Sequence, residues 1–208
     1  MSKIQPIVEG HGEVEAVPVL LRRLRDEAQA FGLDVGRPIR RNRSDLVRED
    51  PLRTAVRLAL LQPDCTAVLI MFDADDDCPR ELAPVIQAWA ADEAGSVPVA
   101  VVMPNREYEA WFLASVESIR GRCGIRPDAP AYGGPETPRD AKGELEESMQ
   151  AGRTYSPTAD QASLTAILEL STAYRQSRSF RRMTRAFGLL ASGAGFELAD
   201  WPPSAWEQ

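Results

Sequence analysis

The stretch Ala67-Val-Leu-Ile-Met-Phe72, followed directly by Asp73, decides the fold of this 208-residue chain. Six consecutive apolar residues are typical of a strand that is buried on both faces of a sheet. Apolar runs at residues 4–8 and 97–103, and a weaker one at 35–40, predict three further strands. Helical spacing of apolar residues predicts helices at 14–31, 50–62, 79–93 and 105–119. This alternation predicts an α/β fold with a mostly parallel four-stranded sheet flanked by helices.

The second half of the sequence has a different character. Residues 122–138 are rich in proline and glycine and predict a loop. Helical patterns follow at 139–150, 160–175 and 178–191, with no further strand. We therefore expect an α/β core over residues 1–120 and a helical C-terminal extension, residues 121–208, packed on that core.

The composition narrows the class of protein. Acidic residues outnumber basic ones by 31 to 24, giving a net charge of -7, which argues against a protein that coats nucleic acid by charge alone. An enzyme whose acids hold cations remains compatible with this balance. The sequence has no apolar run long enough to span a bilayer and no signal-peptide pattern. Three widely spaced cysteines exclude a disulfide scaffold, so we expect a cytoplasmic protein without a membrane partner.

Acidic residues follow three of the four predicted strands. Glu9 follows the first, Asp73 and Asp75 follow the third, and Glu107 and Glu109 follow the fourth. Because ligands of open α/β sheets bind beyond the carboxyl ends of the strands, these side chains indicate a site for Mg²⁺ or Mn²⁺, which prefer oxygen ligands. Alternation along a strand would turn both aspartates to one side. The alternative is that these acids cap helices and solvate turns.

Other polar residues have two interpretations each. Glu13 lies one helical turn after Glu9 and either joins the same edge or favours a helix N-terminus. His11, the only histidine, is interpreted as a solvated turn residue. Lys142 is a candidate phosphate ligand in a chain with only two lysines. A face of the last helix carries arginines that either contact phosphate or are merely solvated: Arg178, Arg182 and Arg185.

Several motifs together resemble the toprim domain of topoisomerases, primases and overcoming-lysogenization-defect nucleases. They resemble still more closely a bacterial toprim-type family of unassigned function, whose members are often encoded beside ATPases of the AAA or ABC kind. The motifs are Val8-Glu9-Gly10-x-x-Glu13, Phe72-Asp73-x-Asp75-Asp76, Glu107-x-Glu109-Ala110-Trp111-Phe112-Leu113 and Ser177-Arg178-Ser179-Phe180. The sequence lacks a strand-passage tyrosine domain and a zinc-binding primase module, which argues against a topoisomerase or a complete primase.

The resemblance implies a Mg²⁺- or Mn²⁺-dependent nuclease domain that cleaves DNA or RNA in a defence or repair system with an ATPase partner. Its metal ligands would be Glu9, Asp73, Asp75, Glu107 and Glu109; its catalytic residues would be Glu9, Glu13 and Lys142; its substrate-binding residues would be Arg178, Arg182 and Arg185. The alternative is a non-catalytic toprim shell that serves as an interaction subunit of an ATPase. A phosphatase of the haloacid-dehalogenase type fits poorly, because its aspartate motif belongs on the first strand.

Overall fold

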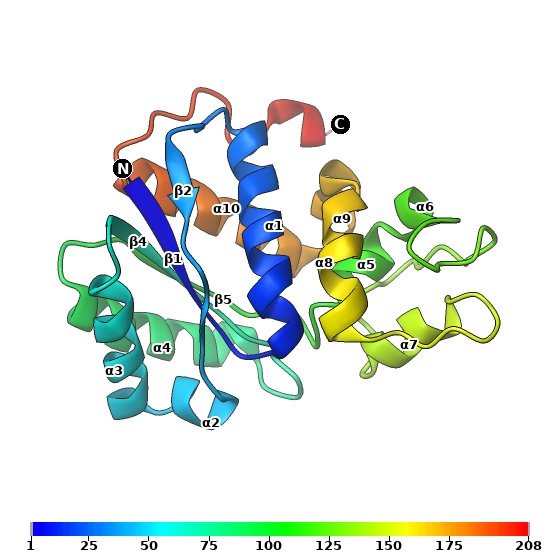
Figure 1. Cartoon of the computed structure of the whole chain (residues 1–208), viewed down its shortest axis with the longest axis horizontal. Coiled ribbons are helices and arrows are strands. Elements are labelled where there is room, and N and C mark those ends of the chain that lie inside the picture. The colour runs from blue at the N-terminus through cyan, green and yellow to red at the C-terminus, as the bar shows by residue number, and fades with distance from the viewer. Residues whose placement is uncertain (1, 208) are drawn as a thin grey trace.

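The computed structural model describes residues 2–207 and contains one parallel sheet (Figure 1). Its strands follow the order β2-β1-β4-β5, and β3 pairs with β1 beyond the end of β2. The strand bounds are Ser2–Val8 for β1, Leu33–Val35 for β2, Ile39–Arg40 for β3, Cys65–Met71 for β4 and Val99–Val102 for β5. The predicted α/β class and parallel sheet are confirmed.

Two layers of helices cover the sheet. On one face, α3 (Glu49–Leu60) and α4 (Pro79–Ala94) pack against side chains such as Ile7, Ile70 and Val101. On the other face, α1 (His11–Glu27) and α10 (Arg178–Gly193) pack with Leu69 and Val102. Since both faces of β4 are buried, its sequence reads as a continuous apolar run instead of alternating.

In Figure 1 the helices between residues 110 and 176 lie together on the side of α1 away from the strands, whereas the short helix at 43–46 lies next to α3. The bounds of the remaining helices are Arg43–Leu46 for α2, Ala110–Ala114 for α5, Val116–Ile119 for α6, Ala141–Glu147 for α7, Pro157–Ile167 for α8, Leu170–Gln176 for α9 and Ser204–Glu207 for the 3₁₀ helix η1. The predicted C-terminal helices are therefore present, and α10 belongs to the main core through Phe180 and Phe187. Among residues 2–207, no helix combines the length and apolar character needed to cross a bilayer.

The N-terminus of α1 makes a close contact with α8. Helix α8 runs beside α1, and a Cβ atom added to Gly12 would stand 2.7 Å from the carbonyl oxygen of Pro157 and 2.4 Å from Gln161 Oε1. Only glycine permits this approach. The sequence therefore uses a glycine to bring the start of α8 against the turn that follows β1.

Three predicted elements differ from the structure. The helix predicted at 160–175 is divided into α8 and α9, because the chain is extended at Leu168. The strand predicted at 35–40 is split into β2 and β3, because the chain at Gly36 passes close to the Gln5 side chain, whose Nε2 donates to the Arg37 carbonyl at 2.6 Å. The helix predicted at 105–119 is absent over 105–109, where Arg106 has a φ of 67°. Helical structure begins only at Ala110.

The two C-terminal tryptophans pack inside the molecule. Trp201 and Trp206 lie with their ring centroids 5.8 Å apart, and Trp201 Nε1 donates a hydrogen bond to the Thr184 carbonyl at 2.9 Å. Trp206 also stacks with Tyr174 and is 6% exposed. Trp206 is thus part of the core, and Trp201 packs against it.

Candidate functional site

A pocket of about 340 Å³ lies at the carboxyl edge of the sheet. It is built where three strands end: α1 begins there after β1, Asp73 follows β4, and the segment after β5 supplies Glu107 and Glu109. The pocket is lined by Gly10, His11, Gly12, Glu13, Asp73, Glu107, Glu109, Lys142, Pro157, Thr158 and Gln161. The topology therefore brings five of the residues that the sequence suggested for a site to one cavity.

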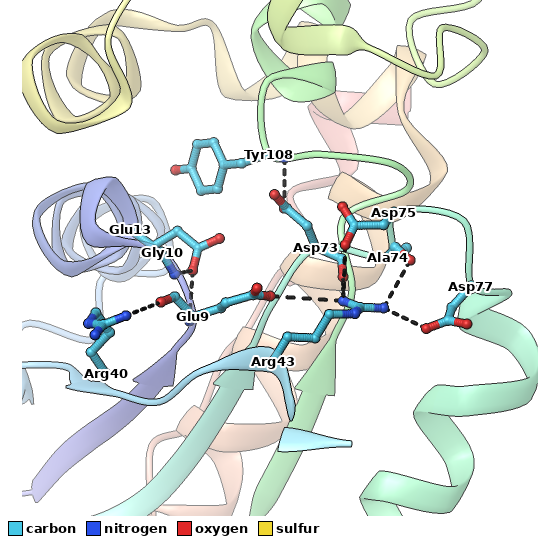
Figure 2. A network of polar contacts seen from close by, with 10 residues as sticks. All are labelled: Glu9, Gly10, Glu13, Arg40, Arg43, Asp73, Ala74, Asp75, Asp77 and Tyr108. Carbon is cyan, nitrogen blue, oxygen red and sulfur yellow. Dashed lines mark hydrogen bonds and ion pairs between the residues drawn. The ribbon is translucent and has the colours of Figure 1, made fainter. Parts of the chain in front are cut away.

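The two aspartates after β4 have different environments. Asp73 is partly buried, and its Oδ1 accepts a hydrogen bond from the Tyr108 amide at 2.9 Å (Figure 2). Asp75 is exposed and has a φ of 49°, so the chain is no longer extended there. The strand alternation expected for this pair is therefore wrong: β4 ends at Met71, and Asp75 reaches the site through a turn.

Arg43, on the short helix α2, connects the acids of two strand ends. Its Nη1 lies 3.9 Å from Glu9 Oε2 and 3.5 Å from Asp75 Oδ2, and it donates to the Asp73 carbonyl. Its Nη2 contacts Asp77 Oδ2 at 2.5 Å. Figure 2 shows the guanidinium surrounded by these carboxylates. Arg43 therefore forms ion pairs with both Glu9, which follows β1, and Asp75, which follows β4.

Glu13 closes the turn between β1 and α1. Its Oε2 accepts hydrogen bonds from the amides of Glu9 and Gly10 at 3.0 and 2.9 Å. Its side chain is buried, 4% exposed, and burial raises its pKa to about 7 against the favourable amide bonds. The nearby carboxylates of Glu9 and Glu109 contribute to this rise in the pKa as smaller causes. Glu13 therefore has both of the roles considered for it, as a helix-start acid and as a member of the acidic cluster.

Glu109 is held by α8 and the segment before it. Its Oε1 accepts a hydrogen bond from the Tyr155 hydroxyl at 2.7 Å and from Gln161 Nε2 at 3.4 Å. Burial raises the pKa of Glu109, and the Tyr155 hydrogen bond opposes that rise. Burial also raises the pKa of the Tyr155 hydroxyl, which therefore remains a proton donor at neutral pH.

Asp73 and Glu9 also have raised pKa values. For Asp73, burial is the largest cause and the neighbouring carboxylates of Glu13 and Glu109 are the next, so its pKa lies well above the usual range. For Glu9, burial raises the pKa and Arg43 opposes it. Such carboxylates are stabilised in their charged form by a cation placed among them.

The donor atoms of this region fit a hard divalent cation. They are almost all oxygens, and two of them, Glu9 Oε2 and Gln161 Oε1, are buried without a hydrogen-bond partner among the described residues. Buried polar atoms of this kind are rare in proteins. In residues 2–207, however, no group of three or more His, Cys, Asp or Glu side chains is close enough to hold a metal ion as the side chains stand. The Arg43 guanidinium occupies the space between Glu9 and Asp75.

The predicted basic residues are divided between two places. Lys142 lines the acidic pocket; its amide donates to Glu107 Oε2 at 2.9 Å, and its ammonium group makes no hydrogen bond or ion pair with a described residue. Arg178 and Arg182 line a different cavity, between α4 and α10. Arg185 lines neither of these two cavities.

Sequence reasoning missed three side chains of the site. Arg43 stood in an arginine-rich segment and was not distinguished from its neighbours. Tyr155 and Gln161 belong to no recognisable motif, because their role depends on how α8 packs beside α1. Only the Gly12 contact, seen in three dimensions, shows why these residues reach the pocket.

Fold and site together define an α/β protein with a carboxylate-rich pocket at the carboxyl edge of a parallel sheet. The chain belongs to the family described as domain of unknown function (DUF4276), which matches residues 8–187. That match covers most of the chain, from the end of β1 to α10, and includes every candidate site residue. No curated protein and no solved structure matches the chain.

Proposed function

We propose that this protein is a toprim-type nuclease domain that hydrolyses phosphodiester bonds in DNA or RNA with Mg²⁺ or Mn²⁺. We further propose that it works in a cytoplasmic defence or repair system with an AAA- or ABC-type ATPase partner. The observation that carries the proposal is that six carboxylates gather near the ends of three strands: four of them line one pocket together with a lysine, and the other two, Glu9 and Asp75, lie beside Arg43. Those acids are Glu9, Glu13, Asp73, Asp75, Glu107 and Glu109.

The proposed roles follow from the contacts. Glu9, Asp73, Asp75, Glu107 and Glu109 would hold divalent cations, which supply Lewis-acid activation of water and of the phosphoryl group. Glu13 fixes the turn that presents Glu9, and with a pKa of about 7 it is suited to exchange a proton near neutral pH. The ammonium group of Lys142 makes no hydrogen bond or ion pair with a described residue and would neutralise charge on the phosphate.

The arginines of α10 would act outside the acidic pocket. Arg178, Arg182 and Arg185 are exposed on one helix and make no ion pair or side-chain hydrogen bond with any residue in the range 2–207. They are therefore available to contact the phosphates of a bound strand away from the cleaved bond. Because the chain has a net charge of -7, we expect weak activity in isolation and higher activity when a partner delivers the substrate.

One observation favours a second function. Arg43 places a fixed positive charge between Glu9 and Asp75 and so neutralises these acids without a metal ion. A protein that keeps the shell of the site and has lost its chemistry would be stabilised in this way. The second candidate is therefore a non-catalytic interaction subunit of an ATPase system.

The test compares cleavage by matched variants. Plasmid DNA and a single-stranded RNA are incubated with Mg²⁺ or Mn²⁺ and the protein, alone and with the ATPase encoded beside it plus ATP. We expect cleavage that disappears in Asp75→Ala and persists in Asp128→Ala, which removes an exposed carboxylate from a loop outside the site.

Two results would contradict the nuclease. Asp75→Ala cleaving as fast as the parent would place the activity in another site or in a contaminant. Absence of cleavage even with the ATPase and ATP would favour the interaction subunit.

A further inference from the structure

A second cavity, larger than the acidic pocket, lies away from it. It has a volume of about 890 Å³ and is open between α4 and α10, along the edge of β5 that has no neighbouring strand. Cavities that bind small ligands are commonly of this size. The α4 wall is formed mainly by small or apolar residues such as Ala83, Pro84 and Ala88.

The free edge of β5 is only partly occupied. The carbonyl groups of Pro98 and Val102 accept hydrogen bonds from β4. The peptide groups of Val99, Val101 and Met103 therefore face away from β4, toward the free edge. The Gln87 side chain of α4 forms hydrogen bonds with two of these groups. Its Nε2 donates to the Val99 carbonyl, and its Oε1 accepts from the Val101 amide, each at 2.9 Å.

The next acceptor and donor along this edge, beyond the pair taken by Gln87, are unpaired among the described residues. The Val101 carbonyl and the Met103 amide have no partner among the described residues, although these residues are only 1% and 3% exposed. Buried peptide groups are nearly always paired, and both residues line the cavity. A ligand with one donor beside one acceptor would satisfy them. The Gln87 amide, which has this pattern, already occupies the preceding position.

The mouth of the cavity is positively charged. Arg80 at the start of α4, and Arg178 and Arg182 in the first turns of α10, are exposed and make no ion pair or side-chain hydrogen bond within residues 2–207. The one carboxylate on the wall, that of Glu136, is already engaged: its Oε1 accepts from Ser177 and from the amide and hydroxyl of Ser179. The guanidinium groups are therefore free to bind an anion.

We propose that this cavity binds a nucleotide. The base would pair with the Val101 carbonyl and Met103 amide against the small residues of α4, since a nucleobase edge presents a donor beside an acceptor. The phosphate would contact Arg80, Arg178 and Arg182 at the mouth. An added peptide strand fits less well, because strand addition needs successive pairs along an edge and Gln87 blocks the preceding ones. The nucleotide is either free or part of a single strand.

The test measures binding by isothermal titration calorimetry in EDTA, so that its outcome does not depend on the proposed metal site. The probes are AMP, the oligonucleotide (dA)6 and ribose 5-phosphate, which has no base. We expect AMP or (dA)6 to bind at least tenfold more tightly than ribose 5-phosphate. AMP binding more tightly than (dA)6 would identify a free nucleotide as the ligand; the reverse would identify a strand.

Two pairs of variants separate the cavity from general charge attraction. Arg178→Ala/Arg182→Ala should weaken binding at least tenfold, whereas Arg22→Ala/Arg122→Ala, which removes two exposed arginines elsewhere, should leave it unchanged. Ala88→Trp fills the cavity from its exposed wall and should abolish binding, whereas Val85→Trp, on α4 outside the cavity, should not. Circular dichroism verifies folding of each.

Three results would overturn the proposal. The first is no binding of AMP or (dA)6 at millimolar concentration. The second is ribose 5-phosphate binding as tightly as both. The third is a folded Ala88→Trp protein that binds like the parent.

Discussion

The buried carboxyl of Glu13 makes the stability of the metal-free protein depend on pH. Burial raises the pKa of Glu13 from 4.5 to about 7 in the folded state. Between these two values the folded protein keeps a proton that the unfolded chain has released, so the free energy of unfolding falls as pH rises from about 4.5 to about 7 and then levels off. Because one pKa unit corresponds to about 1.4 kcal/mol, the loss from Glu13 amounts to about 3 kcal/mol.

Glu13→Gln isolates this effect. Glutamine keeps an oxygen that accepts from the amides of Glu9 and Gly10, but carries no charge to bury. In EDTA we expect the variant to equal the parent at pH 4 and to exceed it by about 3 kcal/mol at pH 8. A smaller fall with pH remains in the variant, because the pKa of Asp73 is also raised.

Urea unfolding at a series of pH values provides the measurement. Glu15→Gln is the control, because it removes one exposed carboxylate from the same helix and should change stability little at any pH. A parent protein whose stability stays constant between pH 4.5 and 7 would contradict a raised pKa for Glu13. So would a Glu13→Gln protein that gains nothing at pH 8.

Three further outcomes are expected. Millimolar Mg²⁺ should raise the melting temperature of the parent protein by ligand linkage, and an unchanged melting curve would count against the metal site. Arg43→Ala should destabilise the metal-free protein by about 2 kcal/mol, because charge-assisted contacts with Glu9, Asp75 and Asp77 are lost. The same variant should bind Mn²⁺ more tightly in calorimetry, because the guanidinium no longer competes for these acids. Lys142→Ala should weaken binding of nucleic acid while leaving Mn²⁺ affinity unchanged, and an equal loss of both would show that Lys142 acts on the metal ligands.

The sheet was predictable because its strands are buried on both faces. The β4 run could be recognised without any neighbour, and the parallel arrangement followed from the alternation of strands and helices. The split between β2 and β3 was not predictable, because it depends on the Gln5 side chain filling the space beside Gly36. The lost helical turn at 105–109 has a similar cause: the Asp73 carboxylate accepts from the Tyr108 amide, so the chain there takes another path.

The acidic residues of the pocket could be predicted from the sequence, but the residues that surround them could not. Strand ends meet at one edge of a parallel sheet, which places Glu13, Asp73 and Glu109 together from topology alone. The position of Arg43 depends on a long side chain reaching from a four-residue helix across two strand ends. Contacts of this kind depend on tertiary packing, and no spacing in the sequence encodes them.

Binding of Mn²⁺ in calorimetric titrations shows whether the acidic pocket holds a divalent cation. We expect the parent protein to bind Mn²⁺, with Mg²⁺ competing, and Asp73→Asn to lose this binding. The metal-free form of Asp73→Asn should be at least as stable as the parent, because one of the mutually repelling carboxylates at the edge has been neutralised. A parent protein that binds no divalent cation, or an Asp73→Asn protein that binds Mn²⁺ as tightly as the parent, would contradict the claim that this acidic pocket is a metal site.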